Sequence, residues 1–173
     1  MALTKLNSAS VIERLPVGSV LQTIQGTSDA RYTLDSTNTW ENTGFVSLTF
    51  PNNLQSNSKV LARIHSLISE DADGNWASSV ALTIFENSTN KGNATIGIVS
   101  GNAHAAGHAS STDYFCERIT GEILFTPSVL NGTYTLHCLA PNSYVRVIGG
   151  TFSTASTNYP YGNTQVILQE IKG

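Results

Sequence analysis

Two histidines are the first residues of this chain whose spacing could support chemistry. His104 and His108 stand four residues apart, and Cys116 follows eight residues after the second. On a helix, a histidine pair at that spacing can hold zinc. The glycines and serines around the pair favour a loop instead, and the glutamate of the H-E-x-x-H metalloprotease motif is missing. We therefore predict two exposed loop histidines, with no bound metal and no cofactor.

A second stretch, containing Asp71, Asp73 and Asn75, resembles the beginning of a calcium-binding loop. Such a loop needs glycine at its sixth position and glutamate at its twelfth, where this sequence has Trp76 and Leu82. An Asp-Gly turn between two strands explains the same residues without an ion. We prefer the turn to a surface calcium site.

The sequence shows no arrangement of nucleophile, base or paired acids. It contains no G-x-S-x-G motif, no cysteine–histidine pair in a plausible frame and no glycine-rich phosphate loop. Glycoside hydrolysis needs two facing carboxylates, and nothing in the sequence brings together any two of Glu70, Asp71, Glu117 and Glu122. We expect a protein that is not an enzyme and has no catalytic residues.

The elements that must position these residues are β-strands. Short runs rich in β-branched and aromatic residues alternate with clusters of glycine, asparagine and aspartate, which is typical of an antiparallel sandwich or barrel. A parallel α/β fold would need helices between the strands, and the spacing leaves no room for them. The predicted strands cover residues 20–25, 45–50, 59–69, 79–86, 94–100, 114–125, 133–139, 144–149 and 165–172.

Several of these runs alternate between apolar and polar residues, so one face of each is predicted to lie in the core. Leu61, Leu67, Ala81 and Phe85 fall on the opposite, wetter faces. Strands that are apolar on both sides are usually covered on both sides, so we expect a second copy of the chain over the outer face. The predicted core positions are Val60, Ala62, Ile64, Ile68, Val80, Leu82, Ile84, Tyr134, Leu136 and Cys138.

Composition and charge exclude several classes of function. Only 12% of the 173 residues are charged, the formal net charge is −3 and there is no basic run, so no binding of nucleic acid is expected. No stretch approaches the roughly 18 apolar residues of a membrane span, and the first residues contain no signal-peptide core. A protein made without export keeps its thiols reduced, so we expect Cys116 and Cys138 to be buried thiols rather than a disulfide.

The beginning of the chain differs from the rest. Pro16 stops any helical turn that starts near Ser10, so we divide the chain into an N-terminal arm, residues 1–16, and a β-sandwich domain, residues 17–173. A free tail would lack apolar side chains. We expect the arm to dock on a partner, although it could also pack loosely on its own domain. Its predicted contact residues are Leu3, Leu6, Val11, Ile12 and Leu15.

One long loop is predicted to present aromatic side chains. Residues 149–163 join two strong strands, and loops of this length are uncommon and often functional. Tyr159 and Tyr161 flank Pro160, and Phe152 lies earlier in the same loop. Rigid aromatic residues among small polar neighbours suit protein or sugar surfaces. We predict recognition by these three residues together with the two loop histidines, although a loop folded onto its own domain is an equal alternative.

Three stretches of the chain carry a family resemblance. Leu15-Pro16-Val17-Gly18-Ser19-Val20-Leu21-Gln22 is similar to an L-P-x-G-S-V-L-Q junction, and residues 50–61 are similar to a T-P…S-S-K-I-L-V hairpin, with Phe50-Pro51 in place of Thr-Pro. Thr164-Gln165-Val166-Ile167-Leu168-Gln169-Glu170-Ile171 resembles an S-x-I-T-V-x-E-I closing strand. Junction, hairpin and closing strand belong to a family of small bacteriophage virion proteins. The resemblance implies a jelly-roll β-sandwich that forms homotrimers on the outer surface of the phage particle.

Proteins of that kind serve either as cement on the capsid or as tips of tail fibres and tailspikes. No heptad segment, β-helix repeat or collagen-like shaft precedes the sandwich in this sequence. We therefore expect a capsid cement or decoration protein that is made in the host cytoplasm and binds the major capsid protein. The alternatives are a receptor-binding tip that touches a host cell-surface glycan and a free carbohydrate-binding module. The loops 101–111 and 150–163 are expected to face the medium.

Overall fold

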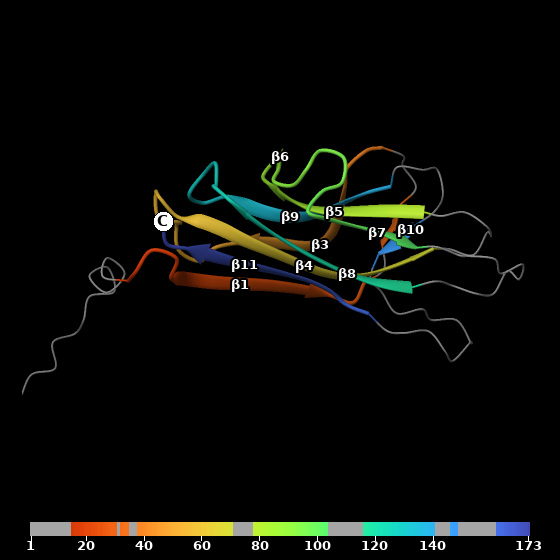
Figure 1. Cartoon of the computed structure of the whole chain (residues 1–173), viewed down its shortest axis with the longest axis horizontal. Helices are drawn as coiled ribbons and strands as arrows, with labels where there is room; N and C mark the ends of the chain where they lie inside the picture. Colours follow the sequence, from red (N-terminus) through yellow and green to blue (C-terminus); the bar gives the residue numbers. More distant parts are fainter. Residues whose placement is uncertain are drawn as a thin grey trace, which may run out of the picture.

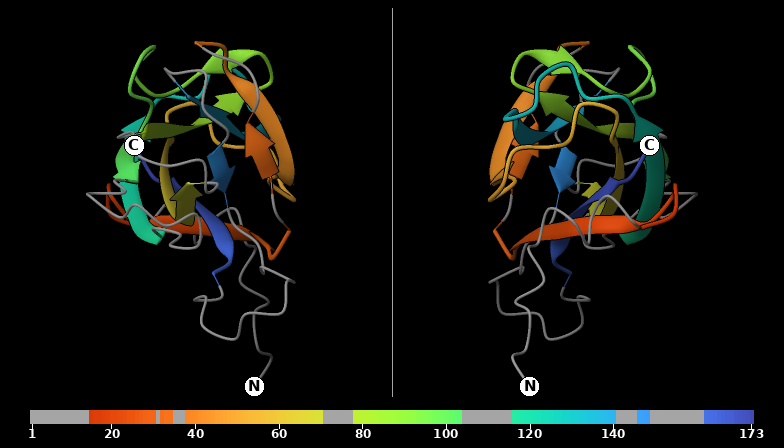
Figure 2. Two further views of the ribbon diagram at one scale, coloured as in Figure 1. Left: turned by 90° about the vertical axis from the view of Figure 1, so that its right-hand side faces the viewer. Right: turned by 90° about the vertical axis from the view of Figure 1, so that its left-hand side faces the viewer.

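The computed structural model describes residues 15–30, 32–34, 38–70, 78–103, 116–140, 146–148 and 162–173. These residues form an all-β structure without helices, in which two antiparallel sheets pack face to face (Figure 1). The predicted β-sandwich is therefore confirmed. Figure 2 looks along the sandwich from its two ends.

The first sheet is built around the longest strand, β4. One edge of β4 pairs along its length with β8, and the other edge pairs first with β11 and then with β10. Beyond these, β11 pairs with β1 and β10 pairs with β2. The strands are β1 (Val20–Ser28), β2 (Tyr32–Leu34), β4 (Lys59–Glu70), β8 (Cys116–Phe125), β10 (Arg146–Ile148) and β11 (Thr164–Ile171).

The second sheet is built around β5 and β9. β5 and β9 pair with each other at its centre. The other edge of β9 pairs with β3. The other edge of β5 pairs with β7 near the beginning of β5 and with β6 near the end of β5. The strands are β3 (Glu41–Thr49), β5 (Ser78–Glu86), β6 (Thr89–Asn90), β7 (Val99–Ala103) and β9 (Thr133–Leu139). Six of the ten connections between the described strands cross from one sheet to the other, as in a Greek-key sandwich.

The core lies between the sheets and is filled by the inward positions of β4, β5, β9 and β11. All ten core positions predicted from the alternation are buried, which confirms the predicted faces. Val166 and Leu168 of β11 and Val46 of β3 complete the contact between the layers. Tyr134 packs edge-on against Phe50, with ring centroids 5.9 Å apart.

Three of the four apolar side chains predicted on the outer faces contact other parts of the same chain, whereas Leu61 is half-buried and pairs with the exposed Leu124. Leu67 is 4% exposed and lies against Gly162, and Ala81 is 4% exposed beside Leu139 of β9. Phe85 stacks on His137 with ring centroids 3.9 Å apart. Leu67, Ala81 and Phe85 therefore do not require a second copy of the chain, and the homotrimer stays a prediction.

The strand predicted over residues 94–100 is wrong in its first half. Residues 94–96 form a turn, and β7 begins only at Val99. The Asn93 side chain accepts hydrogen bonds from the backbone N–H groups of Thr95 and Ile96, and Gly97 has a positive φ of 64°. An asparagine that bonds the backbone two residues ahead favours a turn over a strand, and here this local preference overrides the apolar run. The short strands β2 and β6 were not predicted.

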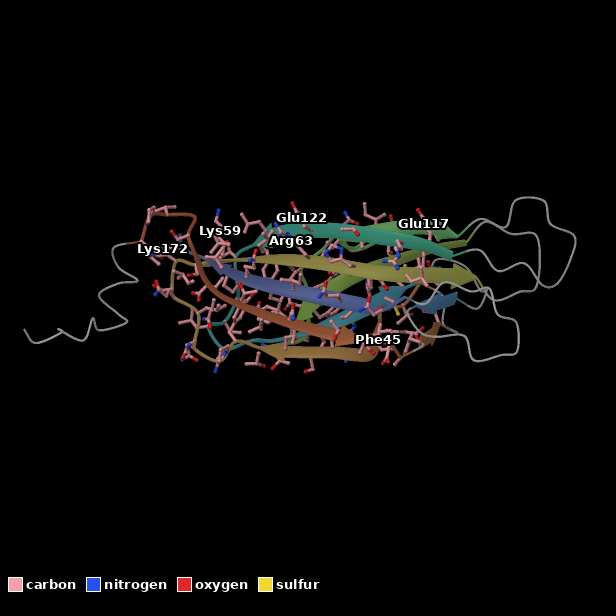
Figure 3. The ribbon with its side chains drawn as sticks, turned by 90° about the horizontal axis from the view of Figure 1, so that it is seen from below. Phe45, Lys59, Arg63, Glu117, Glu122 and Lys172 are labelled. Carbon is pink, nitrogen blue, oxygen red and sulfur yellow. The ribbon has the colours of Figure 1, made fainter. Side chains whose placement is uncertain are left out.

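The sandwich has two distinct ends. We call the arm end the region formed by residues 15–20, 50–59, 124–132 and 171–173, and the loop end the opposite region, where β4, β7 and β9 finish. In Figure 3, which shows β8, β4, β11 and β1 side by side, Lys59 and Lys172 mark the arm end and Glu117 marks the loop end. The segments 71–77, 104–115, 141–145 and 149–161, which join strands at the loop end, lie outside the described residues.

Candidate docking surface at the arm end

Exposed apolar side chains gather at the arm end. Six large apolar side chains are exposed within the described part of the chain, and only Ile96 lies elsewhere. Single exposed apolar residues are normal on protein surfaces, but their concentration in one region marks interaction sites. The five at the arm end are Val17, Val20, Leu124, Val129 and Leu130.

The base of the predicted arm is fixed to the end of β11. The backbone N–H of Gly18 donates to the Lys172 carbonyl at 2.8 Å, and the Lys172 N–H donates to the Ser19 carbonyl at 2.8 Å. The Lys172 ammonium donates to the Leu15 carbonyl at 2.7 Å. The chain preceding Leu15 therefore starts from a defined point beside the C-terminal residues.

A tight turn projects Val17 away from the sandwich. The Ser19 N–H donates to the Pro16 carbonyl at 3.1 Å, and Gly18 has a φ of 87°. A glycine at positive φ in the third position of a four-residue turn is the pattern of a type II turn. Val17, at the second position of the turn, is 78% exposed. The Leu-Pro-Val-Gly-Ser stretch thus encodes a rigid apolar projection.

A buried carboxylate holds the loop of residues 50–58. Glu170 of β11 is 2% exposed, and it accepts hydrogen bonds at 2.7 Å from the Gln55 backbone N–H and from the Gln22 side-chain amide. The same amide also donates to the Asn52 carbonyl at 3.0 Å. Three segments that are distant in the sequence are thereby tied together at one corner.

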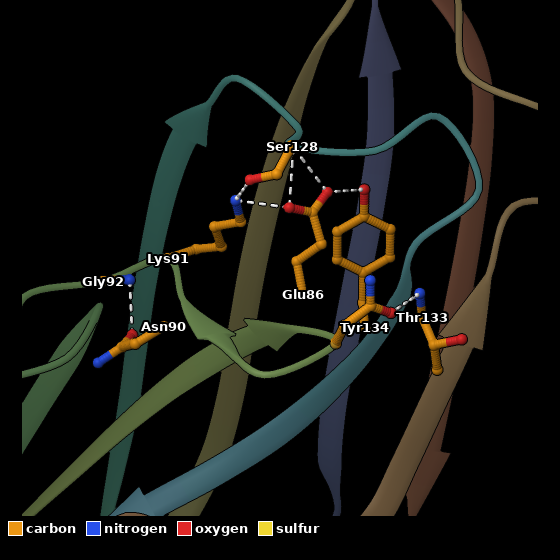
Figure 4. A network of polar contacts seen from close by, with 8 residues as sticks. Glu86, Asn90, Lys91, Gly92, Ser128, Thr133 and Tyr134 are labelled. Carbon is orange, nitrogen blue, oxygen red and sulfur yellow. Dashed lines mark hydrogen bonds and ion pairs between the residues drawn. The ribbon is translucent and has the colours of Figure 1, made fainter.

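A second buried carboxylate holds the loop of residues 126–132. Glu86, at the end of β5, is 1% exposed, and one of its oxygens lies 2.6 Å from the Lys91 ammonium (Figure 4). The Ser128 N–H donates to both carboxylate oxygens, at 2.8 and 3.0 Å, and the Tyr134 hydroxyl donates at 3.2 Å. The Lys91 ammonium also donates to the Ser128 hydroxyl. Val129 and Leu130 follow Ser128 directly, so this network fixes their position.

The electrostatics of this network favour the charged carboxylate. Burial by itself raises the pKa of Glu86, but the hydrogen bonds from Lys91 and Ser128 and the charge of Lys91 outweigh it and lower the pKa below its usual value. Burial, reinforced by the neighbouring carboxylate of Glu86, raises the pKa of Tyr134 far above its usual value. Each carboxylate oxygen already accepts hydrogen bonds, so Glu86 serves to hold the loop rather than to transfer protons.

Most of the predicted site residues fall on segments outside the described residues. These are the arm positions Leu3, Leu6, Val11 and Ile12 and the recognition positions His104, His108, Phe152, Tyr159 and Tyr161. Leu15 is described: it is half-buried, and its carbonyl is bound by Lys172. The structure therefore brings only the base of the arm into the surface at the arm end.

Sequence reasoning missed the two carboxylates that organise this surface. Glu86 continues the inward alternation of Val80, Leu82 and Ile84, and Glu170 continues that of Val166 and Leu168. A carboxylate on an inward position must be buried, and a buried carboxylate needs partners. The alternation alone was thus a sufficient signal for both residues, although not for their partners.

Within the described ranges, no group of three or more histidine, cysteine, aspartate or glutamate side chains could hold a metal ion. Cys138 is a free, buried thiol whose pKa is raised far above its usual value, mainly by burial. The side chain of Cys116 lies outside the described residues. Across the same ranges, no helix is long and apolar enough to span a membrane.

No protein-family model matches this chain, and no curated protein matches it in sequence. The similarity to phage virion proteins therefore rests on the three stretches quoted above.

Proposed function

We propose that this protein is a structural component of a bacteriophage particle, a homotrimeric capsid cement protein that docks through its arm end. The observation that carries the proposal is the set of exposed apolar side chains at the arm end, of which Val129 and Leu130 lie on the loop that Glu86 holds. A surface that is already ordered loses little conformational entropy on binding. Burying one valine or leucine side chain contributes about 1.5–3 kcal/mol before the costs of association.

The three stretches that resemble phage virion proteins meet at this surface. Residues 15–22, 50–61 and 164–171 are far apart in the sequence, yet Gln22 bonds Asn52 and Glu170, and Glu170 bonds Gln55. Their contact supports reading them as one unit rather than as three chance similarities. This unit includes the base of the arm that we propose as the capsid anchor.

The strand order supports a jelly-roll topology for the sandwich. The major strands follow the order β1-β11-β4-β8 in one sheet and β3-β9-β5-β7 in the other. This is the pattern of two interlocked Greek keys, which is common in viral capsid and lectin domains. Topology alone does not establish a function, so this argument agrees with the arm-end surface and does not replace it.

In the proposed mechanism, the trimer spans neighbouring capsid subunits and binds only the assembled shell. By linkage, a ligand that binds the assembled state alone stabilises that state. Three arms on one trimer add avidity, so each contact can be weak. The major capsid protein is the proposed partner, the outer surface of the virion is the proposed location, and the host cytoplasm is the proposed site of synthesis.

The test uses particles that lack their own copies of the protein. Cosedimentation with these particles is measured for the full chain, for a chain without residues 1–14, and for Val129→Asp. Ile96→Asp is the matched control, because it places the same charge on an exposed apolar residue outside the arm end. We expect the deletion and Val129→Asp to abolish coating, and Ile96→Asp to coat normally.

Two results would overturn this proposal. Normal coating by the deleted chain and by Val129→Asp removes the arm end as the anchor. Binding of all variants to host cells, with no binding to shells, replaces the cement function with a receptor-binding tip. Light scattering on the purified protein tests the homotrimer separately, and a monomer at micromolar concentration contradicts it.

A further inference from the structure

We propose that a polar pocket at the loop end binds the carboxylate group of an acidic glycan. The pocket has a volume of about 80 Å³. Its lining includes His65 of β4, Arg118 and Thr120 of β8, and Asn163 just before β11. It lies at the opposite end of the sandwich from the surface at the arm end, and the proposal does not rest on the cement function.

The pairing of β4 with β8 brings the two basic side chains together. Leu67 pairs with Arg118 and His65 pairs with Thr120, so Arg118 and His65 are diagonal neighbours on the outer face of the sheet. The Nδ1 atom of His65 lies 3.1 Å from the Thr120 hydroxyl. The Nε2 atom is therefore the ring nitrogen that remains for a ligand.

Among the described residues, no neighbouring carboxylate compensates the charge of this pocket. No carboxylate pairs with the exposed Arg118 within the part of the chain that the structure describes. Glu117 lies on the alternate face of β8, and its carboxylate is beside Gly101. Glu122 is already paired with Arg63 at 2.9 Å. An unpaired guanidinium offers two parallel donors that match the two oxygens of a carboxylate.

Close backbone packing shapes the wall of the pocket. A Cβ atom on Gly162 would lie 2.6 Å from the Cβ and 2.7 Å from the Cδ2 of Leu67, so only glycine allows this approach. The approach brings Asn163 beside β4, where its amide and the Thr120 hydroxyl are uncharged hydrogen-bonding groups.

Size and polarity together indicate the ligand. One ordered water needs roughly 15 Å³, so this volume accepts a carboxylate with a few attached atoms and leaves the rest of a sugar chain outside. The uncharged donors next to Arg118 suit the hydroxyl groups that accompany the carboxylate of a uronic acid. A free phosphate shares the anionic charge but has no sugar ring that carries hydroxyl groups beside it.

The experiment is an NMR titration of the full chain with trigalacturonate, with its methyl ester and with inorganic phosphate. We expect shifts in the amides of Arg118, Gly162 and Asn163 with the acid and none with the ester. Arg118→Gln should raise the Kd by about tenfold or more. Arg63→Gln removes the same charge from the same face and should change the Kd by less than about twofold. Amide dispersion of each variant reports its folding.

Four outcomes would overturn the proposal. The first is that the ester binds as tightly as the acid, and the second is that Arg63→Gln and Arg118→Gln lose affinity equally. The third is that phosphate saturates the protein at a lower concentration than trigalacturonate does. The fourth is that about 10 mM acid, a concentration that detects millimolar affinity, causes no shift. None of these outcomes bears on coating of particles, so this proposal and the cement function fail independently.

Discussion

The arm end and the loop end of the sandwich are ordered by different physical means. At the arm end, Glu86 and Glu170 are buried, and each bonds a backbone N–H of a loop that has no regular structure of its own. At the loop end, Arg118 and His65 stand on the outer face, and Gly162 packs directly on Leu67. Buried charge fixes one end, and close packing shapes the other.

This difference shows how a chain with few charged residues distributes them. Glu86 and Glu170 order two loops at the arm end, where apolar side chains are exposed, and the basic residue Arg118 has no partner among the described residues. An apolar surface suits a large permanent partner, whereas a small cationic pocket suits a weak ligand that is bound and released.

The largest effect is expected for Glu86→Gln. The variant leaves the Lys91 ammonium buried without a counter-charge, and breaking a buried pair in this way costs about 3–5 kcal/mol of unfolding free energy. Urea unfolding measures the loss. Glu122→Gln is the control, because its surface pair with Arg63 contributes only about 0–1 kcal/mol. Equal losses in the two variants would show that the Glu86 network does not hold the arm end.

A smaller loss is expected for Glu170→Gln. The Glu170 carboxylate accepts from the Gln55 N–H and from the Gln22 amide. In the variant, the new NH2 group faces one of these donors, so one buried hydrogen bond is lost. We expect this loss to lower the free energy of unfolding by about 1–3 kcal/mol. Hydrogen exchange provides the local measurement: the Gln55 amide should exchange faster in the variant, while amides of β9 keep the order of their protection. Unchanged exchange at Gln55 would remove the proposed role of Glu170 in fixing residues 50–58.

The core faces of the strands could be predicted from the sequence, whereas the contacts that order the two ends of the sandwich could not. Alternation in β9 placed Tyr134, Leu136 and Cys138 in the core, because one face of each strand is buried. The partners of Glu86 could not be predicted, because Ser128 comes from a loop 42 residues away. The meeting of Arg118 with His65 depends on strand register, and a slip of one residue would place them on opposite faces.

Acid should weaken the arm end through Glu86. Because the folded-state pKa of Glu86 lies below its usual value, its contribution to stability is complete above that usual value and is lost as pH falls through the lower, folded-state pKa. The urea midpoint of the wild type should therefore fall more steeply on acidification than that of Glu86→Gln. Parallel curves for the two proteins would mean that other carboxylates account for the acid sensitivity.

The smallest effect is expected at the turn that projects Val17. Gly18 has a φ of 87°, and a Cβ atom placed there would meet no atom within 4 Å, so any cost of substitution comes from the backbone conformation alone. Gly18→Ala should lose about 1 kcal/mol, and Gly18→Asn should lose less, because asparagine tolerates positive φ better than alanine. Urea unfolding ranks the two variants, and coating of particles should follow the same order, since the turn orients Val17 and the base of the arm.

Equal stability of the two variants would mean that the positive φ is not what constrains this turn. Gly18→Asn could also lose coating as completely as the chain without residues 1–14 does. That result would mean that docking at the arm end depends more on the geometry of the turn than on the apolar residues before it.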